Sequence, residues 1–178
     1  GAAYAVKECK RAGIRTIMIT GDNPLTARAI GEKTGIGTET ATGAELDAMS
    51  SSEFSSAVEK CNIFARVNPE HKYKIVEELK AKGEIVAMTG DGVNDAPALK
   101  TADIGCAMGL GGTDVARAAG DIILADDNFA TIVKAVASGR EMYENIKKSV
   151  HFLLSSNIGE IITIFTALLM GCATPLCP

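Results

Sequence analysis

The feature that most constrains this chain is a long apolar run near its C-terminus. Apolar residues dominate from Phe152 to Cys172, and a helix of about 20 such residues crosses the hydrocarbon core of a bilayer. Because backbone in lipid must satisfy its own hydrogen bonds, the run predicts a membrane-spanning helix. Positive charge on its N-terminal side predicts that the preceding residues lie in the cytoplasm. The basic residues on that side are Lys134, Arg140, Lys147 and Lys148.

Before Phe129, short apolar runs alternate with helical patterns. This alternation predicts an α/β fold, in which helices cover a Rossmann-like parallel sheet. The polar, serine-rich stretch from Thr38 to Ser56 shows no strong period beyond a helix over its second half. The runs typical of buried strands are Thr16–Thr20, Asn62–Val67, Glu84–Thr89, Asp103–Met108 and Asp121–Leu124.

The two patterns together predict four parts. We expect an α/β domain over residues 1–128, a stalk helix over 129–149, a transmembrane helix over 150–172 and an extracytoplasmic loop over 173–178. The chain begins within a helical pattern and is too short for a complete transport protein, so we expect it to be an excerpt of a longer one.

Composition excludes some functions. The net charge is -4 and Trp is absent, so neither a basic footprint nor stacking platforms for nucleic acid are expected. No zinc-type spacing or compact disulfide framework links the cysteines, which predicts reduced thiols. The five cysteines are Cys9, Cys61, Cys106, Cys172 and Cys177.

Polar residues follow three of the predicted strands. In an open parallel sheet, ligands bind beyond the carboxyl ends of the strands. Thr20-Gly21-Asp22 occupies one such end, the segment from Arg66 to Lys72 a second, and the run from Thr89 to Asp95 a third. Taken singly, these residues have ordinary interpretations, since Asp22 suits a helix cap and exposed basic residues are usually solvated.

Asp91 and Asp95 are separated by a glycine-containing turn, so both carboxylates are expected to face one small volume. Paired carboxylates suit Mg²⁺ and a phosphoryl group, and Lys72 would add a fixed positive charge for phosphoryl oxygens. In the run TGDGVNDAPALKTAD, from Thr89 to Asp103, a strand, a sharp turn, spaced acids and a helix start all agree. This agreement favours a functional site.

The string TGDGVNDAPAL closely resembles the hinge motif of P-type ATPases, which are members of the haloacid dehalogenase-like superfamily. The strings IMITGDN, ARVNPEHKYKIV and ADDNFATIVKAVASGR occur in that family's order. The resemblance covers essentially the whole chain. It implies the C-terminal portion of a phosphorylation domain, joined to the fifth transmembrane helix of a cation pump that uses ATP and Mg²⁺.

The resemblance implies nucleotide and phosphate contacts for the first two strand ends. Thr20 would hydrogen-bond the phosphoryl group, and Gly21 and Asp22 would lie near the nucleotide phosphates. Arg66 would lie beside the bound nucleotide, and Lys72 would neutralise charge on the transferring phosphate.

At the third strand end, the resemblance implies a magnesium site. Asp91 would coordinate the catalytic Mg²⁺, Asp95 would support that site, and Asn94 would contact phosphate or nucleotide. The family's phosphorylated aspartate lies upstream in a DKTGT motif, which these 178 residues lack. Turnover of ATP is therefore expected to need the remaining domains of the same pump.

Within the apolar run, Glu160 and Asn157 are one helical turn apart and share a face. A carboxylate at mid-bilayer is costly and normally faces an ion path, although a satisfied glutamate in a soluble core helix is the alternative. Ser156, Thr163 and Thr166 lie on the same half of the helix and add oxygen ligands.

The string SSNIGEI resembles the fifth helix of sarcoplasmic-reticulum-type calcium pumps, which implies that Asn157 and Glu160 bind Ca²⁺. Sodium/potassium and proton/potassium pumps share a similar pattern, usually with Pro where this chain has Gly159. Two hypotheses from other classes remain, a soluble phosphatase of the same superfamily and a non-catalytic binding module. The apolar run disfavours the phosphatase, and the missing GxxxxGK[ST] string disfavours a P-loop enzyme.

Overall fold

The computed structural model describes residues 1–171. The chain divides into two compact units, Gly1–Val133 and the part from Lys134 onward. The loop predicted for residues 173–178, the last residue of the predicted transmembrane helix, Cys172, and also Cys177 lie outside the described residues.

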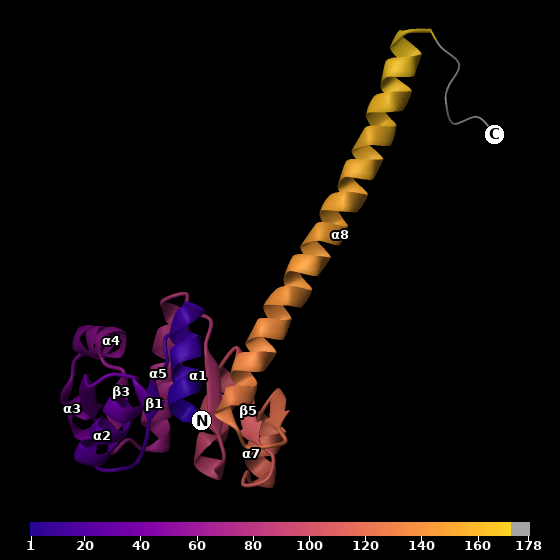
Figure 1. Cartoon of the computed structure of the whole chain (residues 1–178). Coiled ribbons are helices and arrows are strands. Elements are labelled where there is room, and N and C mark those ends of the chain that lie inside the picture. The colour runs from indigo at the N-terminus through magenta and orange to yellow at the C-terminus, as the bar shows by residue number, and fades with distance from the viewer. Residues whose placement is uncertain (172–178) are drawn as a thin grey trace. The chain divides into compact units, whose positions relative to one another are not determined.

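Strands and helices alternate through the first unit (Figure 1). The strands are β1 (Met18–Ile19), β2 (Thr40–Thr42), β3 (Ile63–Ala65), β4 (Ala87–Gly90), β5 (Ile104–Met108) and β6 (Ile122–Leu124). The helices are α1 (Ala2–Arg11), α2 (Pro24–Thr34), α3 (Gly43–Ala48), α4 (Ser51–Lys60), α5 (Pro69–Ala81), the 3-10 turn η1 (Val93–Asp95), α6 (Ala96–Thr101), α7 (Asp114–Ala119) and α8 (Phe129–Leu169).

The strands form two parallel sheets of three strands each, in the orders β1-β3-β2 and β4-β5-β6. The predicted parallel α/β fold is thus confirmed, with two sheets in place of one. Within residues 1–171, β1 pairs only with β3 and β4 pairs only with β5. Each of these two strands therefore has one unpaired edge.

Helices cover both faces of the first sheet, and β3 contributes to the core on each face because neighbouring residues of a strand point in opposite directions. Phe64 belongs to a core cluster with residues of β2, α3, α4 and α5. Ile63 and Ala65 belong to a separate cluster with Val6 of α1 and Ala27 of α2. All three β3 residues are fully buried, as expected for a strand with helices on both faces.

Helix α5 contributes to the cores beside both sheets. Ile75 and Leu79 pack in the cluster around Phe64, whereas Val76 packs with Met88 of β4 and with α6 and α7. This helix therefore connects the two sheets, and its first turn carries Lys72.

The sequence determines where α5 and α2 begin. Asn68 accepts a hydrogen bond from the His71 backbone N–H, and Pro69 occupies the first helical position of α5. Asn23, and not Asp22, caps α2, because its side chain accepts a hydrogen bond from the Leu25 N–H. Gly35 ends α2 at φ 81°, in the left-handed region that glycine adopts without steric cost.

The stretch from Thr38 to Ser56 is more ordered than its composition predicted. It contains the strand β2, which pairs with β3, and then helices α3 and α4. Thr42 and Ser50 each form a capping box, with Glu45 and Glu53 respectively. A three-residue strand with two threonines was missed because so short a run shows no alternation of apolar residues.

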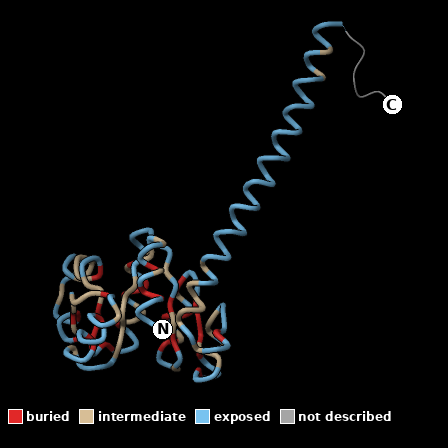
Figure 2. Tube along the Cα trace, viewed as in Figure 1, coloured by how far each residue is buried: buried red, intermediate tan, exposed pale blue. Residues whose placement is uncertain are grey.

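Helix α8 continues from Phe129 to Leu169 over 41 residues. None of its residues is buried, in contrast to the strands of the first unit (Figure 2). It is long and apolar enough to cross a membrane. The boundary drawn between residues 149 and 150 corresponds to no break in the helix.

Candidate functional site

An ion pair forms the centre of the candidate site. Lys72 Nζ donates to Asp95 Oδ1 at 2.5 Å. The side chains are 18% and 8% exposed respectively, so both charges lie largely out of water. A buried carboxylate needs such a partner, and the pair fixes the ammonium group of α5 beside the loop that follows β4.

The second oxygen of Asp95 organises that loop. Asp95 Oδ2 accepts hydrogen bonds from the backbone N–H groups of Asp91, at 3.3 Å, and of Gly92, at 3.2 Å. Gly90 allows the close approach, because a Cβ there would lie 2.5 Å from the Asp95 Cβ. Lys72, Asp91, Gly92 and Asp95 thus form one unit, which we call the Lys72 cluster.

Asp91 contributes an exposed carboxylate to the Lys72 cluster. Its main-chain carbonyl accepts a hydrogen bond from the Thr113 N–H at 2.8 Å, a contact that sequence reasoning missed. Asp95 is buried and bonded through both oxygens, whereas the carboxylate of Asp91 is exposed and is the more accessible of the two to a cation. One carboxylate fits Mg²⁺, which usually keeps several waters and binds phosphate oxygens as well.

A second group of predicted residues lies at the carboxyl ends of β1 and β3, and we call it the Thr20 cluster. The Asp22 N–H donates to Thr20 Oγ1 at 3.1 Å, and the Arg66 N–H donates to the Asp22 carbonyl at 3.0 Å. Arg66 is exposed and adopts φ 49°, a conformation uncommon for residues other than glycine. Such strain is found at functional sites when the surrounding structure holds it.

The two clusters are joined through the chain from Arg66 to Lys72, which comprises the short connection after β3 and the first turn of α5. No hydrogen bond or ion pair links them directly within residues 1–171. Gly21 and Asn94 are exposed beside the Thr20 and Lys72 clusters respectively. The structure therefore places the predicted residues of the first unit at or near the carboxyl ends of β1, β3 and β4, in two clusters.

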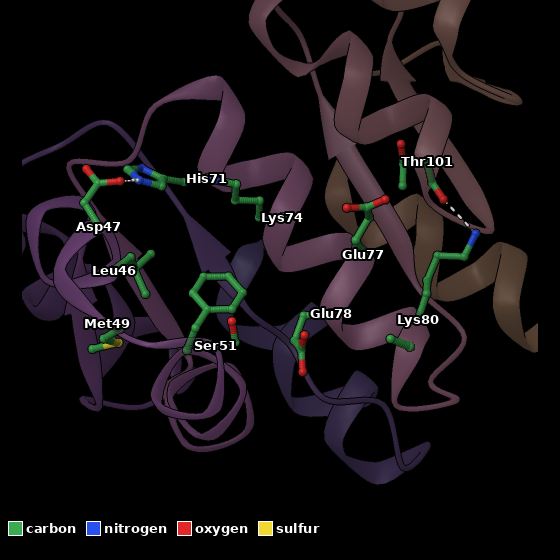
Figure 3. Close-up of a pocket in the computed structure, with 12 residues that line it drawn as sticks. Leu46, Asp47, Met49, Ser51, His71, Lys74, Glu77, Glu78, Lys80 and Thr101 are labelled. Carbon is green, nitrogen blue, oxygen red and sulfur yellow. Dashed lines mark hydrogen bonds and ion pairs between the residues drawn. The ribbon is translucent and has the colours of Figure 1, made fainter.

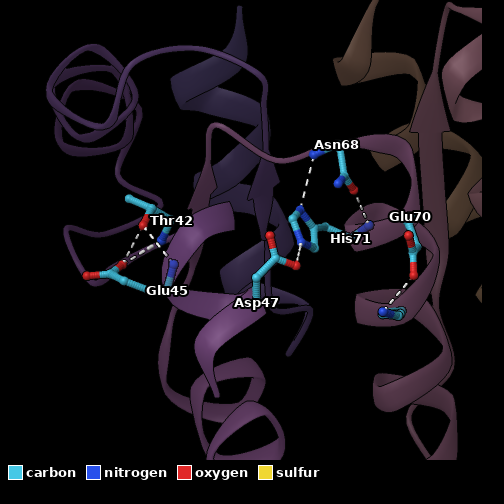
Figure 4. A network of polar contacts seen from close by, with 7 residues as sticks. Thr42, Glu45, Asp47, Asn68, Glu70 and His71 are labelled. Carbon is cyan, nitrogen blue, oxygen red and sulfur yellow. Dashed lines mark hydrogen bonds and ion pairs between the residues drawn. The ribbon is translucent and has the colours of Figure 1, made fainter. Parts of the chain in front are cut away.

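The contacts of His71 stabilise the local fold at the start of α5 (Figure 4). It is 4% exposed, its Nδ1 accepts from the Asn68 N–H at 3.2 Å, and its Nε2 lies 2.8 Å from Asp47 Oδ1. Gly43 packs against the ring, since a Cβ there would lie 3.0 Å from it. The histidine thus fixes the turn between Arg66 and Lys72.

A pocket of about 760 Å³ lies along α5, with α3 and α4 opposite (Figure 3). None of the predicted site residues lines it. Its lysines already have partners, because Lys74 pairs with Glu70 and Lys80 pairs with Asp103. The candidate site is therefore the set of strand ends, and this pocket is separate from it.

On α8, Asn157 and Glu160 are exposed within the apolar segment. The hydroxyls of Thr163 and Thr166 each donate to the carbonyl four residues earlier, at 2.7 Å, which leaves their oxygen lone pairs available. These four residues offer only oxygen and amide groups, a donor set suited to hard cations.

Comparisons with known proteins agree with this geometry. A model of haloacid dehalogenase-like hydrolases matches residues 1–103, and a second model of that description matches residues 71–136. Calcium-transporting ATPase 1 of Bacillus cereus is 60% identical over 98% of this chain and 20% of its own length. The endoplasmic reticulum calcium ATPase srcA of Aspergillus fumigatus is 51% identical over 99% of this chain and 19% of its own.

A crystal structure of a zinc-transporting PIB-type ATPase superposes with a TM-score of 0.71. It is 31% identical, and the match covers 92% of this chain and 22% of that one. The chain thus spans about one fifth of the length of the curated relatives it matches. It belongs to the haloacid dehalogenase-like hydrolase family, with an α/β domain followed by a long apolar helix.

Proposed function

We propose that the full-length protein is a pump that couples ATP hydrolysis, through an aspartyl-phosphate intermediate, to Ca²⁺ transport. The observation that carries this proposal is the Lys72 cluster on the same chain as a membrane-length helix with Asn157 and Glu160. Alone, neither part distinguishes a pump from a soluble phosphatase or an ion-binding helix. Sequence identity of 60% to a calcium-transporting ATPase supports the choice of ion.

The Lys72 cluster would bind the transferring phosphoryl group. Lys72 is held by Asp95, so its charge is already positioned when phosphate arrives, and such preorganisation lowers the cost of stabilising the transition state. The exposed carboxylate of Asp91 would hold Mg²⁺, which when bound neutralises charge on the phosphate oxygens. Asn94, two residues from the Gly92 turn, would contact phosphate or nucleotide.

The Thr20 cluster would complete the site. Thr20 Oγ1 would donate to a phosphoryl oxygen, while Gly21 and Asp22 would lie near the nucleotide phosphates. Arg66 is exposed at the end of β3, where its guanidinium would lie beside the nucleotide. Its strained φ and the hydrogen bond from its N–H to Asp22 support this placement, because they fix the main chain from which the side chain projects.

The unpaired edges of β1 and β4 suggest where the phosphorylated aspartate is held. Thr20 follows β1 and Asp91 follows β4, so each cluster lies at the carboxyl end of an edge strand. A further parallel strand paired with both edges, and ending in the DKTGT aspartate, would bring that carboxylate between Thr20 and Lys72. We infer that another segment of the full-length protein supplies this strand.

The membrane arrangement follows from α8. A helix of this length and composition would cross the bilayer, and the basic residues ahead of the span would keep the first unit in the cytoplasm. Asn157 and Glu160, one turn apart, would contribute oxygen ligands to the transported cation. Helices outside this chain would supply the rest of the coordination shell, since Ca²⁺ takes about six to eight oxygens.

The test is acid-stable phosphorylation of the full-length protein by ATP, titrated with Ca²⁺, for wild type and Glu160→Gln. We expect phosphoenzyme only with Ca²⁺ in the wild type. In the variant, the Ca²⁺ concentration for half-maximal phosphorylation should rise at least about tenfold, because loss of a charged ligand costs more than loss of one neutral hydrogen bond. Glu144→Gln, on the same helix ahead of the span, is the matched control and should behave as wild type.

Three other outcomes separate the alternatives. Phosphorylation that follows Na⁺ or another cation would keep the pump and reject calcium. A Ca²⁺ response that survives Glu160→Gln unchanged would remove Glu160 from the ligands. Absence of phosphoenzyme with every cation would contradict the pump and favour a non-catalytic module.

A further inference from the structure

Asp127, which sequence analysis assigned no role, has an unusual environment. Its Oδ1 accepts the N–H groups of Gly109, at 2.7 Å, and of Leu110, at 3.0 Å, and its Oδ2 accepts the Gly111 N–H at 2.6 Å. The hydrogen bonds from Gly111 and Leu110 hold the pKa of the Asp127 carboxyl below its usual value. One carboxylate thus satisfies three successive backbone donors.

The main chain of Asp127 is held as firmly as its side chain. Asp127 adopts φ 47°, a left-handed conformation that aspartate and asparagine tolerate better than other residues with side chains. Its N–H donates to the Leu124 carbonyl at 3.2 Å. The residue sits in a tight turn between β6 and α8, two residues before α8 begins at Phe129.

The loop that Asp127 binds also holds Asp91. Residues Gly109 to Thr113 form this loop, and the Thr113 N–H donates to the Asp91 carbonyl at 2.8 Å. Arg117 Nη1 stabilises the loop by donating hydrogen bonds to the carbonyls of Gly109, at 3.0 Å, and Gly112, at 2.6 Å. Hydrogen bonds therefore connect the main chain of Asp91 to this loop, and the loop to the carboxylate of Asp127.

The first residue of α8 contacts the other sheet. Phe129 is half-buried and packs against the cluster of Val6, Ala27 and Ile63 on the outer face of β3. The start of α8 thus has two attachments within the first unit, a polar one to the loop beside Asp91 and an apolar one to the core behind Thr20.

We propose that Asp127 is a positioning residue that ties the main chain of Asp91 to the start of α8. Binding at the Lys72 cluster then reaches the helix with Asn157 and Glu160 through the loop Gly109–Thr113 and Asp127. This inference rests on the proposed function, because it assumes that Asp91 belongs to the Mg²⁺ and phosphoryl site. In this role Asp127 acts through the backbone N–H groups that it binds.

The test is hydrogen–deuterium exchange of the full-length protein, with Mg²⁺ and beryllium fluoride as the phosphoryl analogue. Asp127→Asn keeps a side chain that tolerates the positive φ, but removes the charge and one acceptor. In the wild type, we expect the analogue to slow exchange at residues 89–95 and also at 129–133. In Asp127→Asn, we expect slowing at 89–95 alone, with about tenfold more Mg²⁺ needed, as for loss of charge-assisted hydrogen bonds.

Asp103→Asn is the matched control. Asp103 also accepts a backbone N–H, from Val86, and pairs with Lys80, yet it does not contact the loop Gly109–Thr113. This variant should retain the response at 129–133. Protection of the buried Cys106 thiol from labelling checks that each variant is folded.

The outcomes separate the two proposals. An Asp127→Asn protein that responds at 129–133 like the wild type would overturn the inference and leave the proposed function standing. If Asp103→Asn also loses the response at residues 129–133, the inference is overturned as well, because the loss would then reflect general destabilisation of the first unit. A wild type that shows no response at 89–95 would overturn the proposed function, and the inference with it.

Discussion

Asp95 illustrates how much one side chain does at the residue scale. Asp95 is buried. It pairs with Lys72 through one oxygen and accepts hydrogen bonds from two backbone N–H groups through the other. Its spacing from Asp91 predicted that the two carboxylates share one small volume, but not that Asp95 is buried and paired while Asp91 is exposed. This difference depends on the position of α5, and therefore on contacts between residues far apart in the sequence.

Removal of Lys72 should destabilise the first unit. Lys72→Met leaves the Asp95 carboxylate buried without its cation, which typically costs about 3 kcal/mol, and adding Asp95→Asn should recover at least half of the loss. The measurement is the temperature at which Cys106, buried in β5, becomes reactive toward a thiol label in the full-length protein.

Lys74→Met is the control for this experiment. Lys74 is half-exposed and pairs with Glu70 on the surface of α5, so its removal should change stability by less than about 1 kcal/mol. If Lys72→Met and Lys74→Met have equal effects, the ion pair with Asp95 contributes nothing particular to the fold.

At the scale of single elements, helix starts carry the clearest charge effects. Glu45 and Glu53 close capping boxes at α3 and α4, and hydrogen bonds from the N–H and hydroxyl of Thr42 and Ser50 lower their pKa values below 4.5. A carboxyl whose folded pKa is lowered stabilises the fold above its unfolded pKa. That stability is lost as the pH falls from about 4.5 through the folded pKa.

The double variant Glu45→Gln/Glu53→Gln should therefore lose less stability than the wild type between about pH 6 and about pH 3, because it has no carboxylates at these two caps to protonate. Thermal unfolding of the full-length protein across this pH range is the measurement. Glu59→Gln, which alters no helix cap, should keep the wild-type slope. Parallel slopes for all three proteins would show that the capping boxes do not contribute to acid sensitivity.

Elements with strong local signals were predictable, whereas those formed by distant contacts were not. Pro69 and the apolar spacing of Ile75, Val76 and Leu79 identify α5 from sequence alone. Strand β2 was missed, because it is defined by pairing with β3 and not by its own three residues. Asp127 was missed as well, since nothing in ADDN reveals that Gly109 to Gly111 will lie beside it.

At the scale of the whole molecule, the proposed arrangement has a catalytic unit on one side of a membrane. The sequence predicted the helix and its basic flank correctly as elements, since both are local patterns. The long helical pattern that runs from Phe129 into the apolar segment corresponds to the single helix α8.

Trypsin should cleave the first unit of the native protein only where it faces the cytoplasm. In sealed inside-out vesicles, we expect rapid cleavage at exposed basic residues such as Lys33 and Lys82. In right-side-out vesicles, these sites should stay intact until detergent is added. Cleavage in intact right-side-out vesicles would place the first unit on the opposite side.

The continuity of α8 has a mechanical consequence. At about 1.5 Å per residue, Glu160 lies roughly 47 Å along the axis from Phe129. A tilt of the helix axis by only about 5° at Phe129 would displace Glu160 sideways by about 4 Å. Ca²⁺–oxygen distances are about 2.4 Å, so under the proposed function a tilt of this size would be large enough to break the contact between Glu160 and a bound cation.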